Sequence, residues 1–233
     1  MDLEFDRGMR NKYDKIVGID EAGRGPLAGP VVSCAVELDE NQARILLQEI
    51  PFLNDSKKLN RKKHKLIYEY VIKNKIDHAI GISSESEIDI HNILKATCMS
   101  MEKAVSKMNI KKHMCIVDGK NLKLKFDNVQ IIGGDAQSVS IALASNVAKY
   151  VRDTIMIGYS KNYVGYFFDK HKGYGTKKHI ESMKNAGIIP LHRLTFKPVY
   201  ELIKTDILCK WHYEGIISDE RYEAVLRKKE ENS

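Results

Sequence analysis

The segment IVGIDEAGRGPLAGPVV, which runs from Ile16 to Val32, decides the fold class. An apolar run rich in β-branched residues ends on two adjacent acids, Asp20 and Glu21, and continues into a loop with three glycines, one arginine and two prolines. Residues 15–21 and 30–38 have the composition of two strands, and the short loop between them fits an antiparallel pair. The first strand is therefore predicted to bring two negative charges to the start of a glycine-rich loop.

The rest of the sequence alternates between helical and strand patterns. We predict helices at residues 41–50, 57–76, 88–108, 138–157 and 177–186, further strands at 77–83, 114–117 and 129–132, and a charged helix at the C-terminus. Asp55 or Ser56 fits the start of the second helix, and Gly187 fits the end of the fifth. This order predicts an α/β fold, with a mixed central β-sheet flanked by helices and a helical C-terminal extension.

Composition narrows the class of protein. The 233 residues include 38 Lys and Arg against 31 Asp and Glu, a net charge of +7 that suits a polyanionic partner such as nucleic acid. The four cysteines lie far apart without a Cys-x-x-Cys pair, which is typical of reduced thiols rather than of a zinc site. No segment has the apolar length of a signal peptide or a membrane span, so we expect a cytoplasmic protein without a membrane partner.

Three predicted strands end on acids next to glycine: Asp20 and Glu21, then Asp118 in MCIVDGK, then Asp135 in VQIIGGDAQS. Sites of α/β proteins gather at strand ends, and neighbouring strands lie about 4.8 Å apart, so these carboxylates can share a metal site. One such acid alone is more often a solvated turn residue or a helix cap, but three strand ends together favour a site. Oxygen ligands without His or Cys favour Mg²⁺ or Mn²⁺.

Asp20 and Glu21 cannot both face that site while the strand stays regular, because neighbouring strand residues point to opposite faces. Ala22 and Gly23 are small enough to permit a change of direction there. We therefore expect the chain to twist or break at this point, so that Asp20 points inward and Glu21 reaches around the strand end.

The loop GRGPLAG is close to a dinucleotide-binding fingerprint, but its spacing is G-x-G-x-x-x-G and a predicted strand follows it instead of a helix. These two differences exclude a Rossmann nucleotide site. Glycines let a ligand approach the backbone closely, and Arg24 can offer a planar set of donors to a phosphate. The alternative is a plain glycine turn with a solvent-facing arginine.

Six motifs follow one another over residues 15–196: GIDEAGRGPLAGPVVSCAV, NDSKKLNRKKHKLIYE, IVDGK, GGDAQSVSIALASNVAKYVRD, HKGYGTKKHIE and PLHRLTF. Together they resemble the bacterial ribonuclease HII family, also called type 2 ribonuclease H. The resemblance implies a ribonuclease H-like fold and an endonuclease, a phosphodiester hydrolase that cuts RNA joined to DNA. It also implies a part in DNA replication and repair.

The resemblance also assigns roles to residues. The catalytic acids, which also bind two divalent ions, Mg²⁺ or Mn²⁺, in a two-metal mechanism, are Asp20, Glu21, Asp118 and Asp135. Gly23, Arg24 and Gly25 read the ribose 2′-hydroxyl at an RNA–DNA junction. Tyr174 in KGYGT stacks on the deoxyribose after the ribonucleotide, and a core or turn role is the alternative. The expected enzyme hydrolyses the RNA strand of RNA/DNA hybrids and incises 5′ of ribonucleotides in duplex DNA, which leaves 5′-phosphate and 3′-hydroxyl ends.

Several basic residues are candidates for binding the nucleic-acid backbone, and each is otherwise a plain surface charge. They are Lys57, Lys58, Lys149, Lys172, Lys177 and Arg193. Four positions depart from the usual family pattern, either where a basic residue is common or in a normally aliphatic stretch: Gly133, Gln137, Asn146 and Tyr150. These departures motivate one rival, a nucleic-acid-binding protein without efficient catalysis. A second rival is a Mg²⁺-dependent nuclease or phosphatase with an unrelated substrate.

We assign residues 1–196 to the ribonuclease H-like catalytic domain, which includes the Tyr174 region, and residues 197–233 to the C-terminal extension. The related ribonuclease HIII carries an extra N-terminal domain, for which we expect no room before Asp20. We expect a monomer that binds nucleic acid, and a partner such as a sliding clamp is not shown by the sequence.

Overall fold

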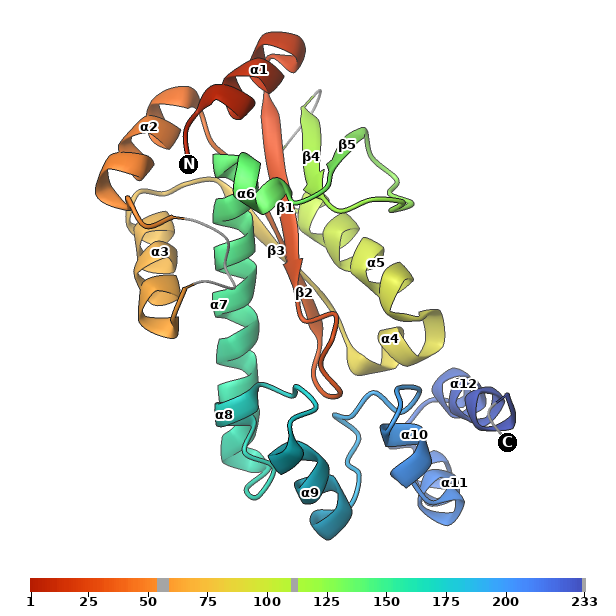
Figure 1. Cartoon of the computed structure of the whole chain (residues 1–233). Coiled ribbons are helices and arrows are strands. Elements are labelled where there is room, and N and C mark those ends of the chain that lie inside the picture. Colours follow the sequence, from red (N-terminus) through yellow and green to blue (C-terminus); the bar gives the residue numbers. More distant parts are fainter. Residues whose placement is uncertain (54–58, 110–112, 232–233) are drawn as a thin grey trace. The chain divides into compact units, whose positions relative to one another are not determined.

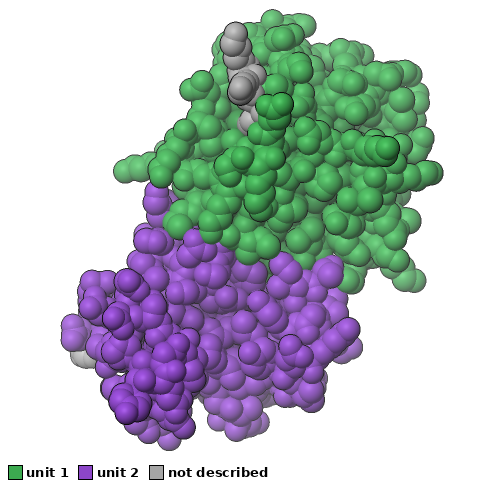
Figure 2. Space-filling view, turned by 180° about the vertical axis from the view of Figure 1, so that it is seen from behind, with its two compact units in different colours: residues 1–22, 32–82, 97–152 green, residues 23–31, 83–96, 153–233 purple. Residues whose placement is uncertain are grey.

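The computed structural model describes residues 1–53, 59–109 and 113–231. The chain forms two compact units, which Figure 2 shows in different colours. Unit 1 holds residues 1–22, 32–82 and 97–152, and unit 2 holds residues 23–31, 83–96 and 153–233. Each unit therefore gathers segments that lie far apart in the sequence.

Unit 1 is built on a five-stranded sheet of order β3-β2-β1-β4-β5. The strands are β1 (Ile16–Ala22), β2 (Val31–Glu37), β3 (His78–Ser83), β4 (Met114–Asp118) and β5 (Asn128–Ile131). β1 pairs antiparallel with β2 and parallel with β4, and β4 pairs parallel with β5. The predicted mixed sheet and its antiparallel first pair are confirmed.

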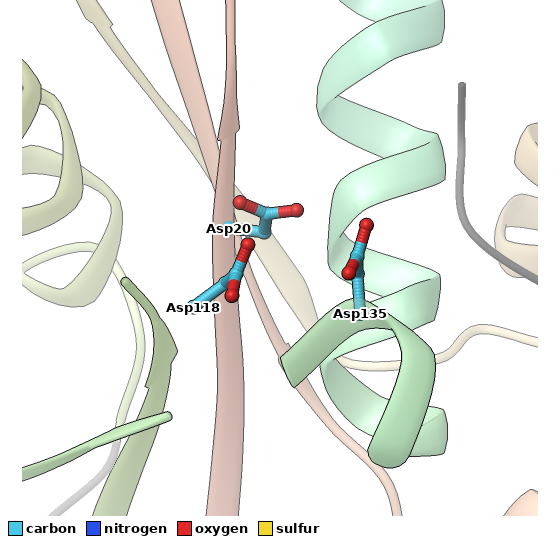
Figure 3. A group of neighbouring side chains, drawn as sticks. All are labelled: Asp20, Asp118 and Asp135. Atoms are coloured by element: carbon cyan, nitrogen blue, oxygen red, sulfur yellow. The ribbon is translucent and has the colours of Figure 1, made fainter. Parts of the chain in front are cut away.

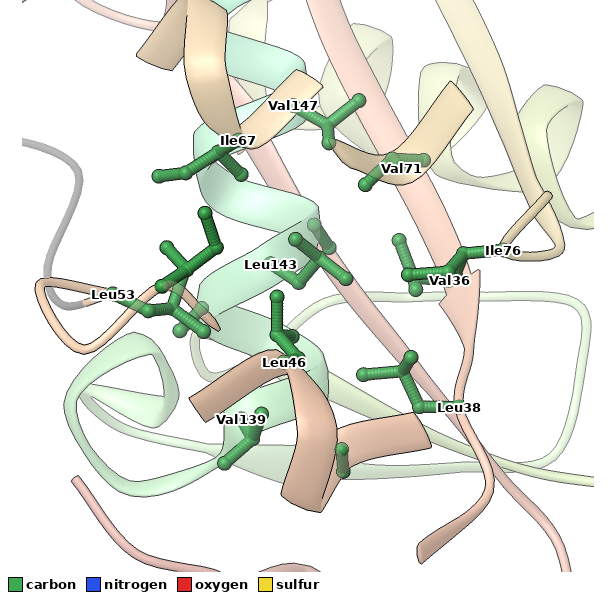
Figure 4. Packing of buried hydrophobic residues seen from close by; sticks show 14 of the residues in the cluster. Val36, Leu38, Leu46, Leu53, Ile67, Val71, Ile76, Val139, Leu143 and Val147 are labelled. Carbon is green, nitrogen blue, oxygen red and sulfur yellow. The ribbon is translucent and has the colours of Figure 1, made fainter. Parts of the chain in front are cut away.

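Helices flank the sheet (Figure 1): α1 (Glu4–Tyr13), α2 (Glu40–Glu49), α3 (Arg61–Lys73), α5 (Ile93–Val105), α6 (Gly134–Gln137) and α7 (Val139–Asn162). On one face, Cys34 and Val36 of β2 pack with α2, α3 and α7, the cluster seen in Figure 4. On the other face, Ala35 of β2 packs with α5. Because successive strand residues face opposite sides, β2 supplies both cores.

Unit 2 is mainly helical, with α4 (Glu85–His91), α8 (Phe168–His171), α9 (Lys177–Ala186), α10 (Val199–Leu202), α11 (Thr205–Tyr213) and α12 (Asp219–Glu230). Its largest apolar cluster joins Leu27, Met183 and Leu194 with Leu208 and Val225. Residues on both sides of position 197 thus share one core. The functional boundary at this position stays a prediction.

Some predicted helices have different limits. The single helix predicted at 88–108 is two helices, because Asn92 adopts a φ of 66° that ends α4. The helix predicted from residue 57 begins at Arg61, where the Asn60 side chain accepts a hydrogen bond from the Lys63 N–H at 3.1 Å. Asp55 and Ser56, the predicted caps, lie outside the described residues. By contrast, α9 has its predicted limits and ends at Gly187 with a φ of 88°.

Among the described residues, no helix is long and apolar enough to cross a membrane.

α1 was not predicted, since its charged sequence carries only a narrow apolar stripe. Its buried Asp6 nevertheless bonds the first turn of α7, where the carboxylate accepts the Ser140 N–H at 3.1 Å and the Ser140 hydroxyl at 2.8 Å. An N-terminal helix thus supplies the anion that the start of α7 favours.

α7 crosses β1 at Gly18. A Cβ at this position would lie 2.3 Å from the Ser140 carbonyl carbon, far inside van der Waals contact. Only glycine permits this approach, which holds the first turns of α7 against the strand that carries Asp20.

We expect Gly18→Ala to lower the free energy of unfolding by at least about 2 kcal/mol, because the added methyl group meets backbone atoms that cannot move aside. Urea unfolding of the purified protein measures this change. Gly8→Ala in α1 is the matched control, since nothing lies within 4 Å of its Cβ, and a gain of roughly 0.5–1 kcal/mol is expected from the better helix former. Equal midpoints for Gly18→Ala and the wild type would contradict the close crossing.

Candidate active site

The carboxylates of Asp20, Asp118 and Asp135 converge from β1, β4 and α6 (Figure 3). One oxygen of each lies within 4.8 Å of the others. Ile19 of β1 stands beside Val117 of β4 in the parallel register, so the next residues along, Asp20 and Asp118, are neighbours at the strand ends. The predicted meeting of these three acids is therefore present, with Asp20 and Asp118 on strands, but the prediction that Asp135 ends a third strand is wrong, since β5 ends at Ile131 and Asp135 lies in α6.

Asp135 reaches the group through the short helix α6. Asp118 pairs with Ile131, the last residue of β5, and its carboxylate accepts the Gly134 N–H at 2.8 Å. Gly133, with a φ of 65°, is the N-cap of α6, so Asp135 lies inside this helix and is not its cap. The turn after β5 thus brings Asp135 back toward the neighbouring strand.

The three acids lie in partly buried surroundings, where Asp20 is 5% and Asp135 is 7% exposed. Burial, followed by the charges of Glu21 and Asp118, raises the pKa of Asp20 well above its usual range. Hydrogen bonds from the Ser145 side chain and from the Glu21 N–H, the latter at 2.7 Å, oppose this shift. A divalent cation would remove the repulsion, and a donor set of carboxylate oxygens fits a hard ion such as Mg²⁺ or Mn²⁺.

Glu21 lies outside this group of three. β1 stays paired with β2 through Ala22, and the chain changes direction only at Gly23, with a φ of 102°. Asp20 and Glu21 therefore follow the regular alternation of a strand, in which neighbours point to opposite faces. The chain changes direction at Gly23, within the expected Ala22-Gly23 pair, but this turn follows Glu21 and does not bring it into the group of three acids. The role of Glu21 as a fourth ligand stays a prediction.

In unit 2, the Gly-Arg-Gly loop (residues 23–30) and the KGYGT segment (residues 172–176) lie side by side. The Leu27 N–H donates to the Gly173 carbonyl at 2.8 Å, and a Cβ on Gly173 would lie 2.4 Å from the Ala28 oxygen. A Cβ on Gly25 would touch the Tyr174 ring at 3.8 Å. Tyr174 is 43% exposed and so is not a core residue. Two of the predicted substrate elements thus meet at one surface.

Arg193 holds the Gly-Arg-Gly loop from inside. Its fully buried guanidinium donates to the carbonyls of Gly23 at 2.5 Å, Arg24 at 2.8 Å and Gly29 at 2.8 and 3.0 Å. In a trans peptide the next N–H points opposite to the carbonyl, so the N–H groups of Arg24 and Gly25 are turned away from Arg193. The prediction that Arg193 binds the nucleic-acid backbone is wrong, since this side chain is buried.

Three histidine rings stack beneath the KGYGT segment. The ring centroids of His171 and His179 are 4.4 Å apart, and those of His179 and His192 are 5.3 Å apart. Burial, with repulsion from His171, lowers the pKa of His179 to about 4. Burial, with repulsion from His179, His171 and Arg221, lowers the pKa of His192 to about 3. Both rings are therefore neutral at physiological pH.

Sequence reasoning missed a buried ion pair between α4 and α12. The Asp89 carboxylate accepts the Arg221 Nε–H at 2.9 Å and also the backbone N–H groups of Leu194 at 3.0 Å and Thr195 at 2.9 Å. Arg221 Nη2 donates to the His192 carbonyl at 2.9 Å. The C-terminal extension is thus bonded to the strip that carries Arg193. No local sequence pattern predicts this ion pair, because Asp89 and Arg221 lie 132 residues apart.

Comparison with known proteins agrees with this arrangement. A sequence model of the family described as ribonuclease HII matches residues 17–199. A ribonuclease HII from Endomicrobium trichonymphae is 48% identical over 205 residues, which cover 86% of this chain and 94% of that protein. The chain belongs to the ribonuclease HII family. It is accordingly a ribonuclease H, a hydrolase that acts on nucleic acid.

Solved structures share the fold of this ribonuclease HII family member. The ribonuclease H2 from Pyrococcus horikoshii superposes with a TM-score of 0.68 at 24% identity, over 80% of this chain and 96% of that chain. Bst ribonuclease HIII, solved in complex with Mn²⁺, gives a TM-score of 0.60 at 18% identity, over 80% of this chain and 68% of that chain. The ribonuclease H-like fold predicted from the sequence is confirmed.

The departures from the usual ribonuclease HII pattern have local partners. Asn146 Nδ2 donates to the Ala142 carbonyl at 2.8 Å, and its Oδ1 lies 2.9 Å from His64 Nδ1. Tyr150 stacks on Tyr68 with ring centroids 4.9 Å apart. Gln137 donates at 3.0 Å to a backbone carbonyl that precedes α6. At two of these positions α7 therefore forms a polar pair and an aromatic pair with α3.

The predicted lysines of this ribonuclease differ in position. Lys57 and Lys58 lie outside the described residues. Lys149 lies on α7 one turn after Ser145, on the helix face that bonds Asp20. Lys172 donates to the Asp169 carbonyl at 2.5 Å. Among the described lysines of this set, Lys149 is therefore placed on the same face of α7 as Ser145, the residue that bonds Asp20.

We expect Mg²⁺ to raise the thermal midpoint of the wild type but not of Asp118→Asn, since the ion screens a repulsion that the variant has already reduced. In chelator, Asp118→Asn should melt above the wild type, because the asparagine Oδ1 can still accept the Gly134 N–H. Asp127→Asn, which removes an exposed aspartate outside the group, is the control and should respond like the wild type. A wild type indifferent to Mg²⁺ would contradict a metal site.

We expect the histidine stack to make stability depend on pH. The pKa values of His179 and His192 in the folded protein lie below the ordinary value of 6.5. The neutral rings therefore contribute fully to the free energy of unfolding above about pH 6.5, and this contribution is lost as the pH falls toward 4. Between about pH 7.5 and about pH 5, the thermal midpoint of the wild type should fall more than that of His179→Asn, which does not titrate at this position. Parallel curves for the two proteins would contradict the neutral stack.

Proposed function

We propose that this chain hydrolyses the RNA strand of RNA/DNA hybrids and incises duplex DNA on the 5′ side of an embedded ribonucleotide, leaving 5′-phosphate and 3′-hydroxyl ends. The observation that carries the proposal is the convergence of the Asp20, Asp118 and Asp135 oxygens within 4.8 Å. Three carboxylates at this spacing, without a basic residue among them, suit divalent cations that also bind a phosphodiester. Mg²⁺ and Mn²⁺ are the proposed ions, and two of them are expected.

Asp20, Asp118 and Asp135 would hold the metal, with Glu21 as the further ligand that the family resemblance implies. When bound, divalent ions supply a more acidic water and stabilise the charge on the leaving oxygen. The chain's own part is to fix these ligands on two paired strand ends and on α6, and to donate hydrogen bonds from the Ser145 side chain and the Glu21 N–H to Asp20, which oppose the rise of its pKa caused by burial. Lys149, on the same face of α7 as Ser145, is proposed to bind a substrate phosphate, and Lys57 is proposed as a second such contact.

Recognition of the ribonucleotide is proposed for unit 2. The N–H groups of Arg24 and Gly25 are turned away from Arg193, an orientation suited to a ligand oxygen such as the ribose 2′-hydroxyl. Gly23 and Gly25 leave the backbone open to close approach. Tyr174, exposed and beside Gly25, is proposed to stack on the following sugar. A hydroxyl-reading loop next to an aromatic surface distinguishes an RNA–DNA junction from plain DNA.

The test uses three labelled substrates: a DNA duplex with one ribonucleotide, the same duplex without it, and an RNA/DNA hybrid. With Mg²⁺ or Mn²⁺ the wild type should cut the first just 5′ of the ribonucleotide, cut the hybrid, and leave the second intact. Asp118→Asn should lower the rate about 100-fold or more, because the lost interaction is worth several kcal/mol in the transition state. Asp127→Asn should cut like the wild type.

Two results of the cleavage assay would contradict the proposal. Binding of the duplex without cleavage under any metal would favour the rival nucleic-acid-binding protein. Cleavage of all-DNA and ribonucleotide-containing duplexes at equal rates would favour a nuclease without sugar recognition. Mapping the product ends completes the test, since a 2′,3′-cyclic phosphate would mean that the ribose hydroxyl, and not water, is the nucleophile.

A further inference from the structure

The main chain of Tyr174 is held by hydrogen bonds at both its N–H and its carbonyl. Its N–H donates to the His171 carbonyl at 2.9 Å. Its carbonyl lies 3.0 Å from His179 Nδ1 and accepts the Thr176 N–H at 2.8 Å. The direction of the exposed ring therefore depends on groups that hold the main chain below it.

The hydrogen bonds of the histidines have one consistent direction. A carbonyl only accepts, so His179 Nδ1 must carry the proton toward Tyr174, and the neutral ring then has a bare Nε2. That atom lies 3.2 Å from His192 Nε2, which must donate to it. His192 Nδ1 lies 3.0 Å from the Ile189 nitrogen and 3.1 Å from the Ile189 carbonyl oxygen, so it can accept from the first or donate to the second. The chain runs from Ile189 through His192 and His179 to Tyr174, and the Tyr174 carbonyl determines the tautomer of His179.

A proton added to His179 would break this chain, because a protonated His179 would point an N–H at the N–H of His192. A proton on His192 Nδ1 would instead replace the Ile189 N–H contact by donation to the Ile189 carbonyl at 3.1 Å. Both rings are fully buried, which disfavours the charged form as well. The titratable and charged groups that face the two rings are His171 of the same stack, Lys172, Lys178, Asp169 and Arg221. Most of these add positive charge, so the surroundings favour the neutral chain too.

The hydrogen-bonded row of histidines is also held at its His192 end. Arg221 donates to the His192 carbonyl at 2.9 Å, and the Tyr166 and Phe168 rings lie 5.5 and 6.2 Å from the His192 ring. The rings of His171 and His179 stack at an interplanar angle of 20°, which leaves their faces covered. A stack this closed is suited to holding a shape and not to transferring a proton to substrate.

We propose that His179 and His192 are positioning residues for substrate recognition, which act by holding the main chain of Tyr174 so that its ring faces the sugar next to the ribonucleotide. This inference rests on the proposed function, since it takes Tyr174 as the substrate contact. It assigns a role in specificity to two buried side chains that touch no substrate.

The experiment compares two substitutions at one position. His179→Asn places an amide nitrogen near the position of Nδ1 and can still donate to the Tyr174 carbonyl. His179→Gln extends toward His192 and places no donor at the Tyr174 carbonyl. We expect His179→Gln to lower kcat/KM on the single-ribonucleotide duplex about tenfold, as loss of a stacking contact does, and His179→Asn to recover most of that loss.

A double-mutant cycle separates positioning from general damage. If His179 acts through Tyr174, then Tyr174→Ala and the double variant Tyr174→Ala/His179→Gln should have the same kcat/KM. His64→Gln is the matched control, because His64 is a buried histidine of unit 1, bonded to Asn146 at 2.9 Å. Any loss it causes should add to that of Tyr174→Ala. The thermal midpoint of every variant is measured as well, and cleavage is assayed well below the lowest midpoint, so that unfolding is not mistaken for slow cleavage.

Three results would overturn the inference. If His179→Gln lowers the activity of Tyr174→Ala further by its full single effect, or if His179→Asn is as slow as His179→Gln, the histidines do not act through Tyr174 while the proposed function stands. If Tyr174→Ala cuts at the wild-type rate, the sugar contact assigned to Tyr174 and the positioning role both fall. Loss of cleavage by the wild type itself would instead concern the proposed nuclease.

Discussion

Mutual repulsion among buried carboxylates is the constraint on which the rest of unit 1 depends. Three acids with oxygens within 4.8 Å of one another would separate if their backbones were free to move. They stay together because each is attached to an element fixed elsewhere: Asp20 to the central strand, Asp118 to its parallel neighbour, and Asp135 to the turn that leads into α7. The apolar packing of the sheet and its helices thus opposes an electrostatic strain concentrated at one point.

α7 is the element through which this opposition acts. Its first turn is pressed on β1 at Gly18 and bonded by Asp6, and one helical turn later its Ser145 side chain reaches Asp20. The same helix accommodates Asn146 and Tyr150, whose partners are a histidine and a tyrosine of α3. A polar pair and an aromatic pair thus join α7 to α3, and the acids remain together beside them.

Local patterns in the sequence were sufficient for the sheet and for the strand-end acids. Short apolar runs beside glycine or proline mark β1, β2, β4 and β5, and pairing of β1 with β4 then brings Asp20 and Asp118 together. The break at Asn92 was not visible, because an asparagine with positive φ interrupts a helical pattern without disturbing its apolar spacing. α1 was missed because most of its residues are charged or polar and its buried residue, Asp6, is itself an acid.

The long-range polar contacts could not be predicted from the sequence. In the sequence, Arg193 looks like any surface arginine. Only the folded structure shows that its guanidinium donates hydrogen bonds to the backbone carbonyls of Gly29, Arg24 and Gly23. Its partner Gly23 lies 170 residues earlier, and this separation has a consequence for synthesis. A ribosome that has released β1, β4 and α6 has already made the whole acid group, while the segment that shapes the Gly-Arg-Gly loop is still to come. Unfinished chains therefore contain the acids but lack the contacts from Arg193 to the loop carbonyls, so the order of synthesis delays the final shape of the Gly-Arg-Gly loop until the strip around Arg193 has emerged.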